Sequence, residues 1–210
     1  MIITSQKLTI TICLVLGVLA ALGAYWWGTR QTPAPVVTTP IVSTRNKVIA
    51  QTTVAARALY TKNGAQLAAL VHPIKGVRFS LYGYVNVTHD KLFMPAQITQ
   101  YFNTPIKFTW GEQDGSGTPI IIPMKQFISA EFADHDYEHA VEILYDTYKG
   151  QGNSLNNMAA LYPNAHIVQF YFPGFNATYG GMDWRAIRVA VEEYQGQWYV
   201  VGLMSDKWTI

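Results

Sequence analysis

The stretch that decides the fold is Trp184-Arg-Ala-Ile-Arg-Val-Ala-Val-Glu-Glu-Tyr-Gln-Gly-Gln-Trp-Tyr-Val-Val-Gly-Leu-Met204. It predicts two β-strands, Trp184–Glu193 and Trp198–Met204, because β-branched and aromatic residues dominate both runs. Gln195-Gly196 supplies the hairpin turn between them. Side chains of a strand alternate between its two faces, and both faces of the first strand are mostly apolar. We therefore expect both faces of this strand to be covered.

The segments before this hairpin predict a further strand and a pair of helices. His166–Phe172 has the same strand-like composition. Residues 45–70 carry apolar side chains at helical intervals, and Asn63-Gly64 divides them into two helices, the second starting near Ala65. His72-Pro73 ends the second helix, because the residue before a proline disfavours the α conformation.

Two short helices are predicted at Pro95–Phe102 and Pro123–Phe132, where a proline stands in the first turn. Helices followed by an antiparallel meander are typical of the α+β class. We therefore expect N-terminal helices packed on one side of a curved antiparallel sheet. The chain contains no internal repeat, so residues 45–210 are expected to form one globular domain.

Composition excludes several classes of protein. Of the 210 residues, 50% are hydrophobic and 13% are charged, whereas globular domains carry about 25% charged residues. A disordered charged tail, a coiled coil and a charge-driven nucleic-acid binder are thereby excluded. Cys13 is the only cysteine, which excludes a disulfide scaffold and a cysteine-based zinc site.

Charge is distributed unevenly along the chain. Residues 1–89 contain eight basic residues and no acidic residue, whereas residues 90–210 contain seven basic and thirteen acidic residues. This asymmetry is consistent with two halves that attract each other, or with an anionic membrane surface beside the basic half. The first interpretation is favoured, because no cluster has the density of Lys and Arg expected of a lipid-binding patch.

A membrane anchor is predicted near the N-terminus. The run from Leu8 to Trp27 carries no charge, and at about 1.5 Å per residue it matches a hydrocarbon core of about 30 Å. Lys7 and Arg30 flank the run, and an aromatic group that suits the headgroup region ends it, namely Tyr25, Trp26 and Trp27. We interpret residues 8–27 as an uncleaved transmembrane signal anchor and residues 1–7 as a cytoplasmic tail.

A cleaved signal peptide is the alternative to this anchor. Val18 with Ala20, or Ala21 with Gly23, would supply the small residues that precede a cleavage site. A lipidated Cys13 is disfavoured, because the apolar sequence before it is too short and the preceding residue is not small.

The orientation in the membrane follows from basic residues near the segment. The residues closest to it favour the N-terminus inside, whereas Arg45 and Lys47 farther along favour the opposite. We expect the C-terminal domain outside the cytoplasm, because a short tail before the first apolar segment is typical of an export signal. Residues 28–44 contain three prolines and no acidic residue, and they predict an extended tether.

Five ordered blocks over about residues 50–210 resemble an uncharacterised family of exported or membrane-anchored bacterial domains without an assigned activity. The blocks are His72-Pro73 with Gly76–Ser80 and Tyr82; Trp110-Gly111 with Asp114–Gly117 and Pro119-Ile120; Gly152–Asn157; Tyr162–Ala165; and Asp183-Trp184 with Trp198–Gly202, Asp206 and Trp208–Ile210. The resemblance implies a cone-like fold similar to nuclear transport factor 2, which hosts enzymes and binding modules alike. The sequence departs from the family at Met204-Ser205, where a histidine near the final aspartate is more usual.

Two motifs invite a metal-site interpretation. His135-Asp-Tyr-Glu-His139 fits the inverted zinc-peptidase motif, but that class needs a further acidic ligand and a far larger chain. Glu112, Asp114 and Ser116 alternate in a Gly-rich stretch, but Pro123 stands where a calcium loop needs an acid. We interpret the first as the acid-rich start of a solvated helix and the second as a tight turn between strands. No metal, cofactor or catalytic residue is predicted.

One set of aromatic and polar residues has the composition of a ligand pocket, although core tryptophans and capping aspartates would have the same composition. The set is Arg78, Tyr82, Trp110, Asp114, Asp183, Trp184, Asp206 and Trp208.

Three functions are compatible with these observations. The first is a non-catalytic, membrane-anchored domain outside the cytoplasm that binds a small ligand or an envelope protein, with the lipid bilayer as a partner through residues 8–27. The second is a cell-envelope hydrolase or isomerase, with an aspartate such as Asp114 or Asp183 as base in a cone-shaped pocket. The third is a structural role in an envelope assembly. A deep pocket that holds an aspartate would favour the enzyme, and a filled interior would favour the binding module.

Overall fold

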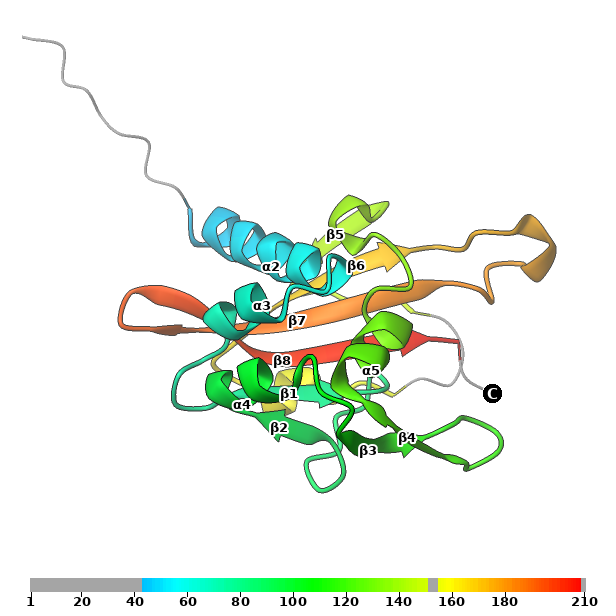
Figure 1. The fold of residues 1–210 in the computed structure, drawn as a ribbon. Helices are drawn as coiled ribbons and strands as arrows, with labels where there is room; N and C mark the ends of the chain where they lie inside the picture. The colour runs from blue at the N-terminus through cyan, green and yellow to red at the C-terminus, as the bar shows by residue number, and fades with distance from the viewer. Residues whose placement is uncertain (1–42, 151–154, 209–210) are drawn as a thin grey trace, which may run out of the picture. The chain divides into compact units, whose positions relative to one another are not determined.

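The computed structural model describes residues 43–150 and 155–208, which belong to one compact unit (Figure 1). The predicted tail, membrane anchor and most of the tether, residues 1–42, lie outside the described residues. Among the residues that are described, no helix is both long and apolar enough to cross a membrane.

The first two helices lie where the sequence predicts them. Helix α2 spans Thr44–Tyr60 and α3 spans Gly64–Leu70. Ser43 and Asn63 cap them, because their side chains accept a hydrogen bond from a backbone N–H of the first turn. Ser43 and Thr44 therefore belong to the domain and not to the tether.

The remaining helices are short. Helices α4 (Pro95–Tyr101) and α5 (Met124–Glu131) confirm the two proline-initiated predictions. Three further elements are single turns: η1 (Tyr137–His139) falls where the sequence predicts a helix start, and α6 (Met158–Leu161) and η2 (Ala177–Tyr179) were not predicted.

Six strands form one sheet in the order β2-β1-β8-β7-β6-β5. Their bounds are β1 Val77–Ser80, β2 Lys91–Phe93, β5 Glu142–Tyr145, β6 His166–Phe172, β7 Arg185–Tyr194 and β8 Gln197–Lys207. The predicted strands correspond to β6, β7 and β8, and the turn at Gln195-Gly196 is confirmed because both residues have positive φ.

The expectation of a purely antiparallel sheet is wrong at one position. Strand β1 pairs with β8 in parallel, with Arg78 opposite Gly202. All the other described strands and helices α4, α5 and α6 lie between β1 and β8 in the chain, and so long a connection permits parallel pairing. A separate antiparallel hairpin consists of β3 (Lys107–Glu112) and β4 (Pro119–Pro123).

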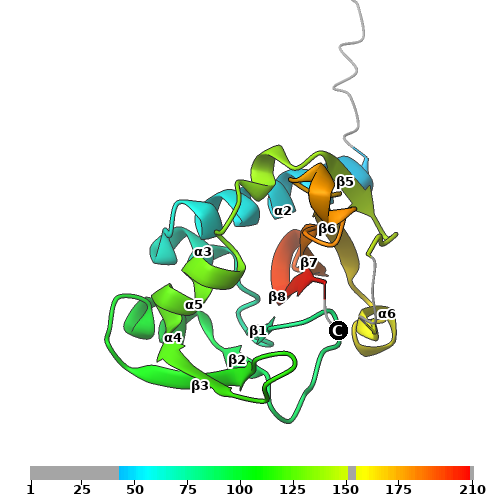
Figure 2. The same ribbon diagram turned by 90° about the vertical axis from the view of Figure 1, so that its right-hand side faces the viewer.

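The curved sheet has a different cover on each face (Figure 2). Helices α2, α3, α4 and α5 lie on one side, and their apolar residues join side chains of the sheet in the main core. On the other side, α6 and neighbouring loops cover a smaller cluster that includes Met158, Ala190 and Met204. Strand β7 is buried on both faces, as its sequence predicts.

The space between the helices and the sheet is filled by aromatic rings. Trp110 of the β3–β4 hairpin is stacked on Phe127 of α5, with ring centroids 3.9 Å apart and an interplanar angle of 5°. Three further rings surround this pair: Phe79 and Phe93 lie 5.9 and 5.8 Å from Trp110, and Phe132 lies 5.8 Å from Phe127, between ring centroids. Edge-on contacts of this kind stabilise a core beyond the area that they bury.

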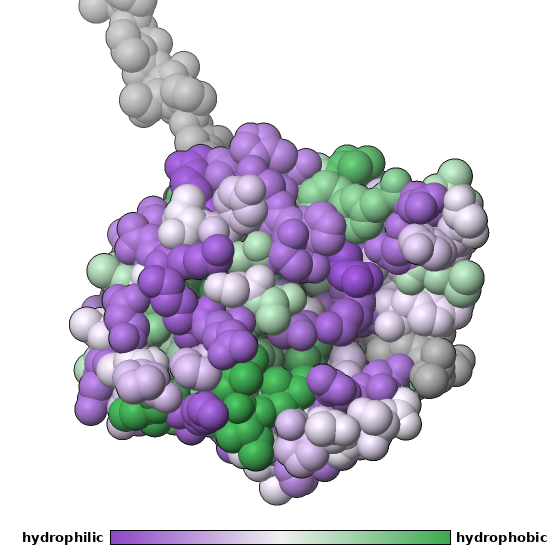
Figure 3. Space-filling model, turned by 45° about the vertical axis from the view of Figure 1, so that its right-hand side comes forward, coloured by the Kyte–Doolittle hydropathy of each residue, from purple (hydrophilic) through white to green (hydrophobic). Residues whose placement is uncertain are grey.

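The surface combines polar and apolar side chains. Figure 3 shows one face of the domain, which is polar over much of its area and has its largest apolar area low on the face and a separate apolar area near the top. Single exposed apolar residues are normal for a soluble surface, and they include Ile74, Val141 and Leu155.

Candidate functional site

The metal-site motifs serve structural roles. Glu138 forms an ion pair with Arg57 of α2, His139 Nδ1 lies 2.9 Å from Asp136, and the ring of His135 is stacked on Phe175 at 4.1 Å. Among the described residues, no group of three His, Cys, Asp or Glu side chains could hold a metal ion. The motif lies in a loop and in the short η1 turn, which corrects the predicted helix start.

The Gly-rich stretch 113–118 is the turn between β3 and β4, as predicted. Gly115 and Gly117 have φ values of +76° and +65°, a backbone conformation that is unfavourable for residues with a Cβ atom. The Ser116 hydroxyl donates to Thr118 across the turn at 3.0 Å.

The eight candidate pocket residues do not form one site. Tyr82 and Trp110 line a first cavity, Asp183 and Trp208 line a second cavity, and Trp184 and Asp206 are buried in the domain. The other two lie beside the first cavity: the guanidinium of Arg78 donates to the backbone oxygens of Val87 and Asp90, and the backbone N–H of Asp114 donates to the Tyr82 hydroxyl.

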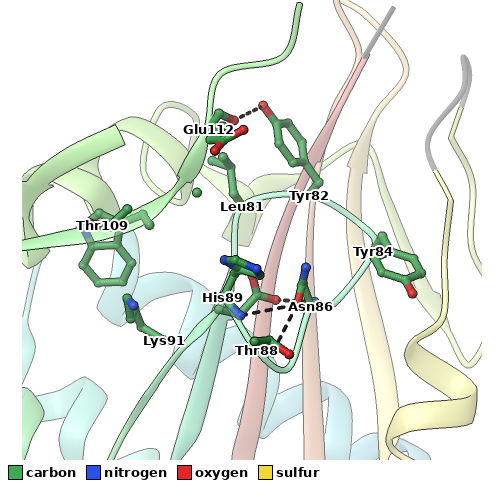
Figure 4. A pocket seen from close by; sticks show the side chains of 12 residues that line it. Leu81, Tyr82, Tyr84, Asn86, Thr88, His89, Lys91, Thr109 and Glu112 are labelled. Carbon is green, nitrogen blue, oxygen red and sulfur yellow. Dashed lines mark hydrogen bonds between the residues drawn. The ribbon is translucent and has the colours of Figure 1, made fainter. Parts of the chain in front are cut away.

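The first cavity has a volume of about 480 Å³, within the range of about 300–1,000 Å³ that is usual for small-molecule sites. Its walls are the loop that follows β1, the start of β2 and the second half of β3 (Figure 4). They consist of Leu81, Tyr82, Tyr84, Asn86, Thr88, His89, Asp90, Lys91, Thr109, Trp110, Gly111 and Glu112. We refer to this space as the β1–β3 cavity.

Tyr82 holds the two walls of the β1–β3 cavity together. Its hydroxyl donates to the backbone oxygen of Glu112 at 3.1 Å and accepts from the backbone N–H of Asp114 at 2.9 Å. Burial is the main cause that raises the pKa of this phenol, so it stays protonated and keeps both bonds at neutral pH.

Asp90 organises the loop wall. Its Oδ2 accepts from the Ser80 hydroxyl at 2.6 Å and from the backbone N–H of Asn86 at 2.8 Å. Burial raises the pKa of this carboxyl, although the hydrogen bonds from Ser80 and Asn86 act in the opposite direction. Asp90 is therefore the aspartate that lines the larger cavity, whereas the sequence pointed to Asp114 and Asp183.

Asn86 fixes the tip of the same loop. Its Oδ1 accepts the backbone N–H groups of Thr88 and His89 at 3.1 and 3.3 Å. An asparagine followed by such a turn is a recognisable sequence signal, and it would have identified Asn86 as a loop organiser. The meeting of this loop with β3 has no comparable local signal.

Trp110 contributes less to the β1–β3 cavity than its residue type suggests. The side chain is 1% exposed, its indole N–H donates to the backbone oxygen of Ile122 at 2.9 Å, and Phe127 covers one ring face. Tyr84 stands at the rim of the cavity and is 52% exposed, so its ring is available to a ligand.

A buried ion pair lies beneath the loop wall. Arg188 Nη2 is 2.5 Å from Asp206 Oδ2, and the two side chains are 4% and 1% exposed. Gly83 of the loop lies directly on this pair: a Cβ atom at this position would be 2.6 Å from Arg188 Nη1 and 2.8 Å from Asp206 Oδ2. The loop therefore needs a residue without a side chain at position 83.

The second cavity, of about 330 Å³, lies beside the loop between β6 and β7. Burial acts to raise the pKa of Asp183, but the N–H groups of Asn176 and Phe175 that it accepts outweigh burial and hold this pKa below its usual range. Trp208 packs against the buried cluster that contains Trp184. Both residues thus have structural roles that are visible in the fold.

Comparisons with known proteins identify no family. No protein-family model matches the chain, and no curated protein matches it. Among solved structures, it is similar to one from Xanthomonas campestris described as "Putative calcium/calmodulin dependent protein kinase II association domain". The two are 13% identical over 81% of this chain and 92% of that chain, with a TM-score of 0.35. A likeness at this level of identity and TM-score does not indicate a function for this chain.

Proposed function

We propose that this protein is a non-catalytic binding module, anchored in a cell membrane by residues 8–27 with its globular domain outside the cytoplasm. The β1–β3 cavity receives its ligand or a segment of its partner. The uncharged run between Lys7 and Arg30 supports the anchor, and the cavity supports the binding role.

The observation that carries this proposal is the filled interior. Aromatic rings occupy the space between the helices and the sheet, and the largest of them, Trp110, is in face-to-face contact with Phe127. The alternative, a hydrolase or isomerase with a cone-shaped pocket, needs an aspartate in a deep cavity between the helices and the sheet. The β1–β3 cavity instead opens beside the core, with exposed Tyr84 at its rim.

The fold is further proposed to be the cone similar to nuclear transport factor 2. Helices α2 to α5 on one side of a curved six-stranded sheet support this assignment. Because that fold hosts both enzymes and binding modules, the function depends on the site and not on the fold.

A hydrolase or isomerase remains the second candidate, on the strength of Asp90. This carboxyl lines the cavity, burial raises its pKa, and the Ser80 hydroxyl lies 2.6 Å away. A raised pKa suits a general acid or base. The two hydrogen bonds that the Asp90 carboxylate accepts from Ser80 and Asn86, however, hold the loop in place, and they explain the residue by a structural role without any reaction.

A ligand screen by thermal unfolding tests the binding module. The full-length chain in detergent is heated with short peptides, mono- and disaccharides, and carboxylic acids, because a ligand that binds the folded state raises the melting temperature. We expect one class to raise it in the wild type and in Tyr60→Ala, and to do so less in Tyr84→Ala. Tyr60 is a matched control, since it is 43% exposed at the end of α2 and does not line the cavity.

Two results would overturn the proposal. If no class raises the melting temperature, the cavity is not a binding site. If a compound from the screen is chemically converted by the wild type and not by Asp90→Asn, the protein is an enzyme.

Protease treatment of intact cells tests the topology. The domain of residues 45–210 is expected to be cut from outside. Protection in intact cells with cleavage after lysis would place the domain in the cytoplasm. Recovery of a chain that begins at Ala21 or Ala24 would show that the N-terminal segment is removed.

A further inference from the structure

Two side chains of opposite charge line the β1–β3 cavity without pairing. Lys91 belongs to β2 and Glu112 to the end of β3. Within residues 43–150 and 155–208, neither side chain has an ion pair or a hydrogen bond. Among the described lysines, Lys75 pairs with Glu192, Lys149 with Glu142 and Lys207 with Glu131. Lys91 differs from the other lysines without an acidic partner in that it lines the cavity.

The two charges stand at different ends of the cavity. Figure 4 shows Glu112 beside Tyr82 at one end and Lys91 at the other. Leu81 and Tyr82 line the wall between loop and hairpin, and the half-buried ring of Tyr82 offers an apolar surface to a ligand body, whereas Leu81 is only 3% exposed. Two separated and uncompensated charges match a ligand that carries two charges of its own.

Asn86 adds a donor for a neutral polar group. Its Oδ1 is occupied by the N–H groups of Thr88 and His89, and in the part of the chain that is described its Nδ2 has no protein partner. This amide lines the cavity together with Thr109 of β3. A peptide carbonyl is an acceptor that fits such a donor.

We propose that the β1–β3 cavity binds a small zwitterion, namely a short peptide with a free ammonium and a free carboxylate. The ligand's ammonium pairs with Glu112, its carboxylate pairs with Lys91, and its peptide group meets Asn86. This assignment rests on the proposed binding function and names the ligand class for the same cavity.

Isothermal titration of the full-length chain in detergent with blocked peptides tests the assignment. The probes are dialanine, N-acetyl-dialanine, which lacks the ammonium, and dialanine amide, which lacks the carboxylate. Charge-assisted hydrogen bonds discriminate strongly between charged and neutral partners. We expect dialanine to bind, and each blocked form to bind about tenfold more weakly or worse.

Single variants then assign each charge to its end of the cavity. Glu112→Gln is expected to remove the preference for dialanine over N-acetyl-dialanine, and Lys91→Gln the preference over dialanine amide. Lys107→Gln is the matched control, because Lys107 is an exposed residue at the start of β3 that does not line the cavity. It should retain both preferences.

The outcomes separate this assignment from the binding function itself. Equal affinity for free and blocked peptides, no dialanine binding at millimolar concentration, or loss of preference in Lys107→Gln would each overturn the zwitterion assignment. If maltose binds with an affinity that Tyr84→Ala reduces while dialanine does not bind, the binding module stands and only the ligand class is wrong. If no compound of the broader thermal screen binds either, both proposals fail.

Discussion

Replacing Asp206 by asparagine tests the energetic role of the buried ion pair. The substitution removes the negative charge with almost no change in shape, so Arg188 stays in place without its counter-charge. Arg188 is 4% exposed, and within the described chain its Nε and Nη1 have no hydrogen-bond partner. Removal of one partner from a buried pair typically costs about 3–5 kcal/mol, against a total stability of about 5–15 kcal/mol. We expect Asp206→Asn to lose a large part of the free energy of unfolding.

Urea denaturation of the full-length chain in detergent measures this loss. With a slope of about 2 kcal/mol per molar urea, the midpoint should fall by about 2 M. The double variant Arg188→Met/Asp206→Leu should recover most of the loss, because an apolar pair avoids the cost of burying two charges. Glu138→Gln is the control, since its pair with Arg57 is at the surface and should leave the midpoint nearly unchanged.

Two outcomes would contradict this prediction. If Asp206→Asn shifts the urea midpoint no further than Glu138→Gln does, an unpaired Arg188 does not destabilise the core as expected. If the double variant is less stable than Asp206→Asn, the pair contributes through specific geometry and not through charge balance.

Four further predictions concern single side chains. Burial and the charge of Lys75 hold the pKa of His72 below its usual 6.5. The stability that the neutral ring contributes above pH 6.5 is therefore lost as the pH falls through the folded-state pKa. In urea titrations, the free energy of unfolding of His72→Gln should depend less on pH below 6.5 than that of the wild type. Burial raises the pKa of Asp90, so the stability that its protonated carboxyl contributes is complete below the usual 3.8 and is lost as the pH rises through the folded-state pKa. Urea titrations should therefore show that Asp90→Asn gains stability relative to the wild type as the pH rises above 3.8. Trp208→Ala should lower the free energy of unfolding by about 2 kcal/mol, since the ring is partly buried against the Trp184 cluster; an unchanged midpoint would instead favour a role of Trp208 in binding. Gly83→Ala should cost about 1–3 kcal/mol through its clash with the buried ion pair, and a crystal structure of this variant should show a displaced loop.

Local sequence signals were sufficient for much of the fold. The hairpin of β7 and β8 follows from two apolar runs and the Gln195-Gly196 turn, and α4 and α5 follow from prolines at their starts. The parallel pairing of β1 with β8 has no local signal, because it depends on how distant segments pack. For the same reason, the small sheet of β3 and β4 was not distinguished from the main one.

The site was harder to predict than the fold. Tryptophan and aspartate occur in pockets and in cores alike: Trp110 borders the cavity but is 1% exposed, and Trp184 is wholly buried. Asp90 and Lys91 were not predicted, because they line the cavity only where the loop after β1 meets the β3–β4 hairpin, and the Tyr82 hydroxyl joins these two segments. Residue type alone does not report such a meeting of distant segments.

The parallel contact between β1 and β8 has a consequence for the order of folding. Strand β8 lies in the middle of the sheet, between β1 and β7, yet it follows every other described strand in the chain. During synthesis, β1 and β2 therefore emerge long before the strand that joins them to the rest, and closing so long a loop is slow. Until β8 arrives, the edges of β1 and β7 that pair with it stay open, and intermediates with unpaired strand edges are prone to aggregate. A nascent chain stalled before residue 197 should thus be a good substrate for chaperones, whereas completed chains should fold in one late, cooperative step.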